Sequence, residues 1–165
     1  MEIKAPWLEH YGDVPRKLSY PSCSMTELVE QSASRYPDDI AYSFMGTHVS
    51  YKDFISGVYS CAKAFAALGI KASSRVMLCL PNVPQAVECF YAINLLGAQA
   101  VMIHPLSSEG ELSFFIENSK PEAVVILNQF YNKFASITSR VSIPKLIVTG
   151  VGHALRGIMK VGYCL

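Results

Sequence analysis

Short apolar runs alternate with longer helical stretches through the second half of the chain. Four runs of Val, Ile and Leu without polar alternation predict strands buried on both faces: 76–80, 100–103, 123–127 and 146–149. Three stretches between them carry apolar residues at helical spacing: 84–96, 109–118 and 130–137. Strands and helices in this order form a mostly parallel sheet with helices on both faces. We therefore predict an α/β fold, doubly wound, in a three-layer sandwich.

Two further helices are predicted upstream of this region. Ser24 and Glu27 have the spacing of a capping box, and Tyr36 followed by Pro37 ends the helix that begins there. A second helix begins after Ser50 and is expected to end at Gly69, where a left-handed residue stops it. Its apolar face is predicted to comprise Phe54, Val58, Cys61, Ala62, Phe65 and Leu68.

A small hairpin is predicted between these two helices. Residues 40–45 and 48–50 flank Gly46 and Thr47, and a glycine in the first position of a two-residue loop favours a type II′ turn. Residues 24–150 therefore form the predicted α/β subdomain. Residues 151–165 begin another helical pattern, which we interpret as the truncated start of the next element.

The first 23 residues differ from the rest in having isolated aromatic residues among prolines. Trp7, Tyr11 and Tyr20 lie among Pro6, Pro15 and Pro21. This pattern predicts an extended arm over 1–23, with little regular structure, laid over the domain by its aromatic side chains.

Composition changes the expected surface more than the expected fold. Hydrophobic residues make up 51% of the chain and charged residues 16%, below the usual charged share of about 25%. We expect exposed apolar surface, and with it a homodimer in the isolated chain. The net charge of +1 favours no nucleic-acid partner. No signal peptide and no apolar run long enough for a membrane span are visible, so we expect a cytoplasmic location.

The five cysteines are expected to be reduced and mostly buried: Cys23, Cys61, Cys79, Cys89 and Cys164.

A search for chemistry at the strand ends yields few candidates. Asn82 is expected to cap a helix whose first turn contains Pro84, and His104 is a lone histidine at a strand exit, where either a structural hydrogen bond or a ligand contact would explain it. Gly150 and Gly152 begin a dinucleotide-binding pattern that Leu155 breaks.

Known catalytic motifs and metal-ligand spacings are missing from the sequence. The four histidines are too dispersed for a metal site: His10, His48, His104 and His153. Four serines are interpreted as helix caps rather than nucleophiles: Ser22, Ser24, Ser107 and Ser108. We assign no catalytic, no cofactor-binding and no metal-ligating residue.

Several successive segments resemble the acyl-adenylate-forming, or AMP-binding, superfamily. Residues 49–54 (Val-Ser-Tyr-Lys-Asp-Phe) and their helix resemble its first core motif, and 75–82 resemble its next strand and turn. Residues 94–106 resemble its second core motif, with His104 where asparagine is often found, and 108–112 resemble the helix that follows. The arm is most similar to that of long-chain fatty-acid CoA ligases.

The resemblance implies a parent enzyme of fatty acid metabolism. Such a ligase activates a carboxylic acid with Mg-ATP to an acyl-adenylate and transfers the acyl group to coenzyme A. The family's phosphate-binding loop, ribose-binding aspartate and carboxy-terminal lysine come later than the matched segments. The resemblance therefore implies a fragment that holds no cofactor, has no activity alone and has the remainder of the parent enzyme as its partner.

A stand-alone doubly wound module that binds a nucleotide or a protein is the alternative. The last five residues, 161–165, form an apolar pattern without a helix stop. We therefore expect a truncated chain rather than a complete module.

Overall fold

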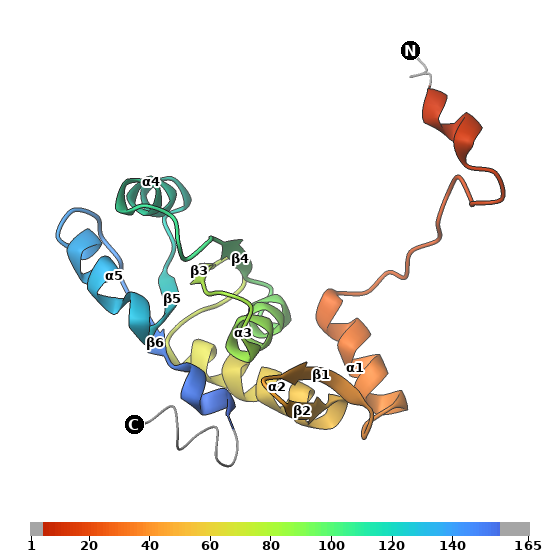
Figure 1. Cartoon of the computed structure of the whole chain (residues 1–165), viewed down its shortest axis with the longest axis horizontal. Helices are drawn as coiled ribbons and strands as arrows, with labels where there is room; N and C mark the ends of the chain where they lie inside the picture. Colours follow the sequence, from red (N-terminus) through yellow and green to blue (C-terminus); the bar gives the residue numbers. More distant parts are fainter. Residues whose placement is uncertain (1–4, 156–165) are drawn as a thin grey trace.

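The computed structural model describes residues 5–155 and has the predicted α/β architecture. Its four-stranded sheet has the order β4-β3-β5-β6, and every pairing is parallel (Figure 1). The strands are β3 (Arg75–Cys79), β4 (Gln99–Met102), β5 (Ala123–Leu127) and β6 (Leu146–Thr149). The bounds of β5 and β6 are those predicted from the sequence, whereas β3 and β4 begin and end one residue earlier.

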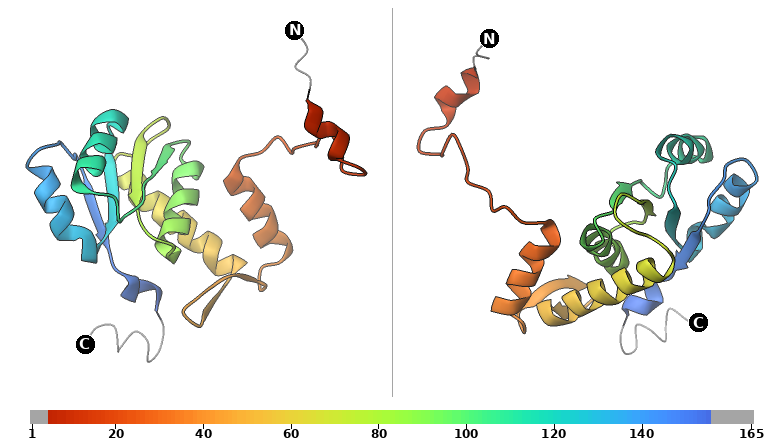
Figure 2. Two further views of the ribbon diagram at one scale, coloured as in Figure 1. Left: turned by 45° about the horizontal axis from the view of Figure 1, so that its top comes forward. Right: turned by 180° about the vertical axis from the view of Figure 1, so that it is seen from behind.

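Two helices cover each face of this sheet, as the views in Figures 1 and 2 show. They are α2 (Tyr51–Ala67) and α3 (Pro84–Leu95) on one face, and α4 (Glu109–Ser119) and α5 (Tyr131–Thr138), preceded by η2 (Asn128–Phe130), on the other. Successive residues of β3 point to opposite faces, so Val76 and Leu78 join one apolar cluster while Met77 and Cys79 join the other. Burial on both faces explains why the strands lack polar alternation, and it confirms the doubly wound sandwich.

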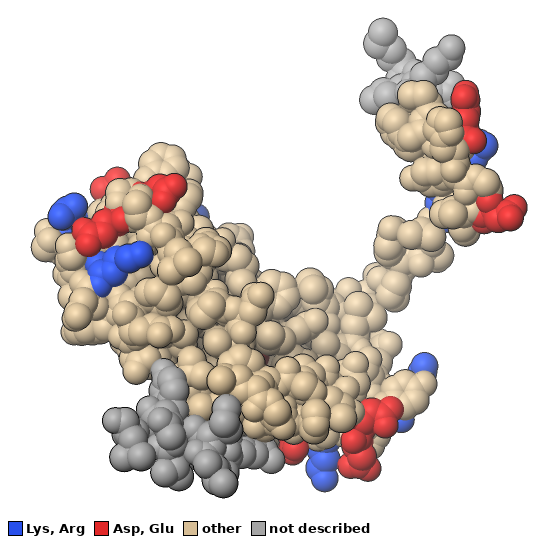
Figure 3. Space-filling view, viewed as in Figure 1, with Lys and Arg blue, Asp and Glu red and all other residues tan. Residues whose placement is uncertain are grey.

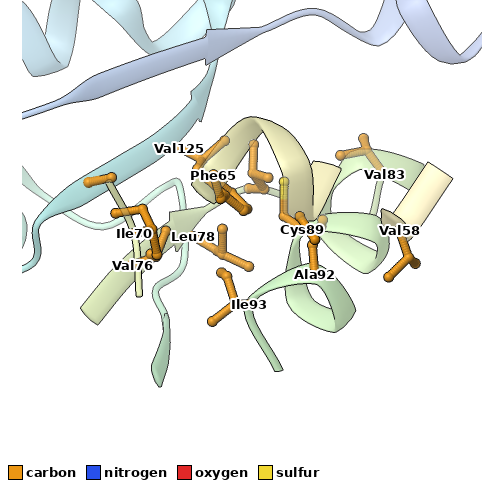
Figure 4. Packing of buried hydrophobic residues seen from close by; sticks show 14 of the residues in the cluster. Val58, Phe65, Ile70, Val76, Leu78, Val83, Cys89, Ala92, Ile93 and Val125 are labelled. Carbon is orange, nitrogen blue, oxygen red and sulfur yellow. The ribbon is translucent and has the colours of Figure 1, made fainter. Parts of the chain in front are cut away.

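The larger cluster lies between the sheet, α2 and α3. Figure 4 shows Val58 and Phe65 of α2 in one cluster with Cys89, Ala92 and Ile93 of α3 and with Leu78 and Val125 of the sheet. Phe54, Val58, Ala62 and Phe65 are buried as predicted.

The predicted apolar face of α2 extends one turn too far. Leu68 remains 42% exposed, because α2 ends at Ala67 and Gly69, with φ +84°, turns the chain away. Cys61 is only half-buried at the edge of the cluster.

The first helix, α1 (Met25–Arg35), begins with the predicted capping box of Ser24 and Glu27. The Thr26 side chain is 1% exposed, and its hydroxyl lies 3.0 Å from both Asn94 Oδ1 and the Tyr91 carbonyl oxygen, either of which accepts its hydrogen. The backbone N–H of Thr26 donates to Asn94 Oδ1 at 3.1 Å. These bonds attach α1 to α3 across a wide sequence separation.

The predicted hairpin forms, but with a different turn. Strands β1 (Ile40–Phe44) and β2 (Thr47–Ser50) pair Phe44 with Thr47, which leaves Met45 and Gly46 as the two-residue loop. Both loop residues have positive φ, 46° and 77°. This is a type I′ turn rather than the expected II′ turn, and its backbone matches the right-handed twist of the strands.

The arm has the little regular structure that was predicted, but its position differs from the prediction. It contains a short 3-10 helix, η1 (Pro6–His10), in which no residue is buried, and it extends away from the sheet (Figures 1 and 2). Trp7 is 55% exposed and Tyr20 79%. Three separated aromatic rings form no continuous apolar face that would offset the entropy lost on ordering the arm.

The described chain closes with a single turn, η3 (Val151–Ala154), after β6. Most of the segment 151–165, for which we expected the start of another element, lies outside the described residues. Over residues 5–155, no helix is long and apolar enough to cross a membrane.

Candidate functional site

The carboxyl edge of the sheet is the candidate site. The chain runs from β3 to β4 on one side and then returns past β3 to β5 on the other, so the winding direction changes between β3 and β5. Open α/β sheets bind ligands beyond the carboxyl ends of their strands at such a point. The loops 80–83 and 103–108, the short helix η2 and Gly150 each follow one of the four strands at this edge.

The two residues singled out at this edge, Asn82 and His104, line one open hollow of about 380 Å³. Nδ1 of the exposed His104 accepts the backbone N–H of Leu106 at 3.3 Å. His104 therefore makes the local hydrogen bond at a strand exit that was one of its two expected roles.

Asn82 does not cap α3, which corrects the sequence prediction. The N-cap is Val83, whose backbone is extended (φ −126°, ψ 156°) and whose side chain makes no capping bond. The helix begins one residue too late for the Asn82 side chain to reach its first turn. Pro84 occupies the start of the helix as expected.

Lys133 organises the loop between β4 and α4 and was missed by sequence reasoning. Its Nζ donates to the backbone carbonyls of Ser107 (3.0 Å) and Pro105 (3.4 Å), and lies 6.0 Å from the centre of the Phe130 ring. The ammonium thus holds the loop that follows His104. No sequence signal pairs a lysine with carbonyls 26 and 28 positions earlier.

A second, more enclosed cavity of about 200 Å³ lies between the hairpin and the start of α3. Gln85 Nε2 donates to the Gly150 carbonyl at 2.9 Å, while its Oε1 is buried without a partner among the described atoms. The Tyr42 hydroxyl donates to Glu88 Oε1 at 3.3 Å. Burial raises the pKa of Glu88, and the Tyr42 hydrogen bond opposes that rise.

Gln85 and Glu88 were detectable from the sequence. They are polar residues three positions apart in an otherwise apolar helical stretch, so both project from one side of α3. The cavity itself was not detectable, because its other wall comes from the hairpin.

The edge offers hydrogen-bonding groups rather than a catalytic pair. Across residues 5–155, no three His, Cys, Asp or Glu side chains lie close enough together to hold a metal ion. His48 is engaged in the hairpin, where its Nδ1 lies 2.7 Å from Ser43 Oγ. The loop 80–83 contains no glycine, and a proline opens the helix after it. These residues do not fit a close-approaching triphosphate.

The fold thus places the chain among open α/β proteins whose sites form at the carboxyl edge. More narrowly, its sequence matches the AMP-binding enzyme family over residues 29–155, and the chain belongs to that family.

Curated relatives support the narrower resemblance. The chain is 27% identical over 152 residues to the long-chain-fatty-acid--CoA ligase of Bacillus subtilis (strain 168), covering 92% of this chain and 27% of that protein. It is 29% identical over 160 residues to the enzyme of the same name from Salmonella typhimurium, covering 93% and 28%. It is 30% identical over 122 residues to the 2,3-dihydroxybenzoate-AMP ligase of Bacillus subtilis, covering 73% and 23%. The chain therefore spans about a quarter of the length of these relatives.

Solved structures show the same fold. The inhibitor-bound N-terminal domain of FACL13 from Mycobacterium tuberculosis superposes with a TM-score of 0.73 at 24% identity, covering 76% of this chain and 33% of that one. The long-chain-fatty-acid-CoA ligase FadD1 from Archaeoglobus fulgidus gives 0.74 at 18% identity, covering 81% and 28%. At these identities the likeness establishes the architecture.

Proposed function

We propose that this chain is the amino-terminal portion of an AMP-forming acyl-CoA ligase. The whole enzyme would activate a fatty acid with Mg-ATP to an acyl-adenylate and transfer the acyl group to coenzyme A. The observation that carries the proposal is the match to long-chain-fatty-acid--CoA ligases along 92% of the chain. The stand-alone module is not favoured, because the family match itself extends over residues 29–155.

Within that enzyme, the role of this portion is structural and positional. Its carboxyl edge does not fit a triphosphate, because the loop 80–83 lacks glycine and Lys133 is committed to backbone carbonyls. The remainder of the enzyme would hold ATP and coenzyme A, and would supply the electrostatic stabilisation that adenylation needs. The isolated chain would have no ligase activity. A cytoplasmic location is part of this proposal.

The distribution of charged residues on the surface supports the proposal that another part of the enzyme covers one face of this chain. Figure 3 shows Lys, Arg, Asp and Glu gathered on the arm, at the α4–α5 end and along the lower rim, while the centre of the visible face is almost free of them. An apolar hollow of about 480 Å³ lies between the hairpin and α3, lined in part by Phe44, Val83 and Met102. We propose that the remainder of the enzyme packs against this face.

A chimeric enzyme tests the proposal. The matching amino-terminal segment of the Bacillus subtilis ligase is replaced by this chain, and palmitate-dependent exchange of pyrophosphate into ATP is measured. We expect exchange well above that of the same ligase with the segment deleted. A chimera that is soluble and unfolds cooperatively, yet exchanges no more than the deletion variant, would contradict the proposal.

The isolated chain supplies the complementary measurement. We expect no pyrophosphate exchange above a control without protein, with palmitate or with shorter carboxylic acids. Exchange that depends on added carboxylate and survives repurification would show an adenylation site within the chain itself.

A further inference from the structure

Two cysteines face each other across the interface of α2 and α3. The Sγ atoms of Cys61 and Cys89 lie 3.7 Å apart, although the residues are 28 positions apart in sequence. The other described thiols lie elsewhere: Cys23 belongs to the arm, and Cys79 belongs to the cluster on the opposite face of the sheet. The packing of α2 on α3 therefore creates a thiol pair that the sequence spacing does not suggest.

The two thiols have different environments. Cys89 is 8% exposed and packs in the apolar cluster near Val58 and Ala92, as Figure 4 shows. Cys61 is half-buried at the edge of that cluster, so a small solute can reach it. A disulfide requires the sulfurs to approach to about 2.05 Å. The sulfurs already lie 3.7 Å apart, so the less confined Cys61 side chain would have to move by less than about 2 Å.

We propose that Cys61 and Cys89 form an oxidisable dithiol that hydrogen peroxide converts to a disulfide joining α2 to α3. In the first step the Cys61 thiolate attacks peroxide, a sulfur–oxygen bond forms, the oxygen–oxygen bond breaks and water leaves after protonation. In the second step the Cys89 thiol loses its proton and attacks the Cys61 sulfur, forming the disulfide and expelling a second water. Two thiols lose two electrons in total, and one peroxide gains them.

The assignment of roles agrees with the electrostatics. The hydrogen bond with Cys89 lowers the pKa of Cys61, against the opposing effects of burial and of Glu88. The same hydrogen bond, followed by burial and the nearby Cys61 and Glu88 charges, raises the pKa of Cys89. Burial raises the pKa of Cys79 to about 11, which makes that thiol a poor competitor. Cys61 is therefore the attacking thiol and Cys89 the resolving one.

Oxidation should change the stability of the subdomain. The new bond would close a loop across the interface of α2 and α3 within the larger apolar cluster. Restricting the unfolded chain in this way is expected to raise the melting temperature of the oxidised chain by roughly 5 to 10 °C over the reduced chain. Addition of dithiothreitol should reverse the shift.

The test is peptide mapping of the full chain after treatment with stoichiometric hydrogen peroxide. We expect a crosslinked peptide pair containing Cys61 and Cys89, and two fewer titratable thiols than the five of the reduced chain. Cys61→Ser should abolish the crosslink, and so should Cys89→Ser. The matched control Cys79→Ser should retain it.

Peptide mapping of the chain without substitutions gives a decisive result even if a variant at a buried cysteine does not fold. A Cys61 that ends as sulfinic acid beside an unreacted Cys89 would overturn the proposal. So would a crosslink made mainly through Cys23, Cys79 or Cys164, or the absence of any crosslink in chain that retains its native melting transition.

Discussion

Replacing Gly97 with valine tests how the chain leaves α3 and enters β4. Gly97 has φ +67°, and its N–H donates to the Asn94 carbonyl at 3.0 Å while the next N–H, of Ala98, donates to Ile93 at 3.0 Å. These two bonds form a Schellman helix stop, which needs a left-handed residue at this position. The Gly97 carbonyl also accepts a hydrogen bond from the backbone N–H of Ser73 at 3.0 Å.

The expected cost of Gly97→Val arises from the backbone. A Cβ at this position would lie 3.5 Å from the Ala72 Cβ, an ordinary contact, so crowding by the first added carbon is small. The left-handed conformation costs an L-residue about 1 to 2 kcal/mol, and a β-branched residue belongs at the upper end. With a urea m-value of about 2 kcal/mol/M, the unfolding midpoint should fall by roughly 0.5 to 1 M.

Gly110→Ala is the matched control for adding a side chain to a glycine. Gly110 lies in α4 with ordinary helical φ, and its Cβ would meet no atom within 4 Å. This change should raise the midpoint, because alanine is favoured over glycine in helices by up to about 1 kcal/mol. An unchanged midpoint for Gly97→Val, with an unchanged m-value, would refute the helix stop and the β3–α3–β4 connection built on it.

Three further predictions concern buried polar groups and the surface. Thr26→Val removes the hydroxyl bonds to α3 and should cost about 1 to 3 kcal/mol in thermal unfolding. Ser34→Ala, at an exposed position of the same helix, should change stability by less than about 0.5 kcal/mol. Burial raises the pKa of the Glu88 carboxyl group. The stabilisation that this group contributes is therefore complete below the pKa it has in the unfolded chain, and is lost as the pH rises through its pKa in the folded chain. Glu88→Gln should therefore gain stability relative to the unmodified chain as the pH rises above 4.5, the ordinary pKa of the carboxyl group, and a difference independent of pH would contradict this. Sedimentation should reveal a dimer, and a single 18.2 kDa species at all micromolar concentrations would exclude it.

The local elements were determined by the sequence alone. The capping serines Ser24 and Ser108 bond to the backbone N–H three residues ahead, so neighbours in sequence decide where α1 and α4 begin. Gly69 and Gly97 likewise stop α2 and α3 through residues within one turn. The uninterrupted apolar run 123–127 required burial on both faces, which made β5 a central strand.

The contacts that shape the candidate site were decided only by the tertiary structure. Lys133 holds the Ser107 carbonyl, and Cys61 meets Cys89, because parallel strands and their helices bring segments more than 25 positions apart together. Local patterns also misassigned the hairpin turn and the cap at Asn82. The pairing of Phe44 with Thr47 places the hairpin loop one position earlier than predicted. The extended backbone of Val83 places the N-cap of α3 one position later than predicted. Hydrophobic periodicity and capping depend on residues within a few positions of one another, so they can be read from the sequence. These contacts depend on how whole helices and strands pack, which a local sequence pattern does not reveal.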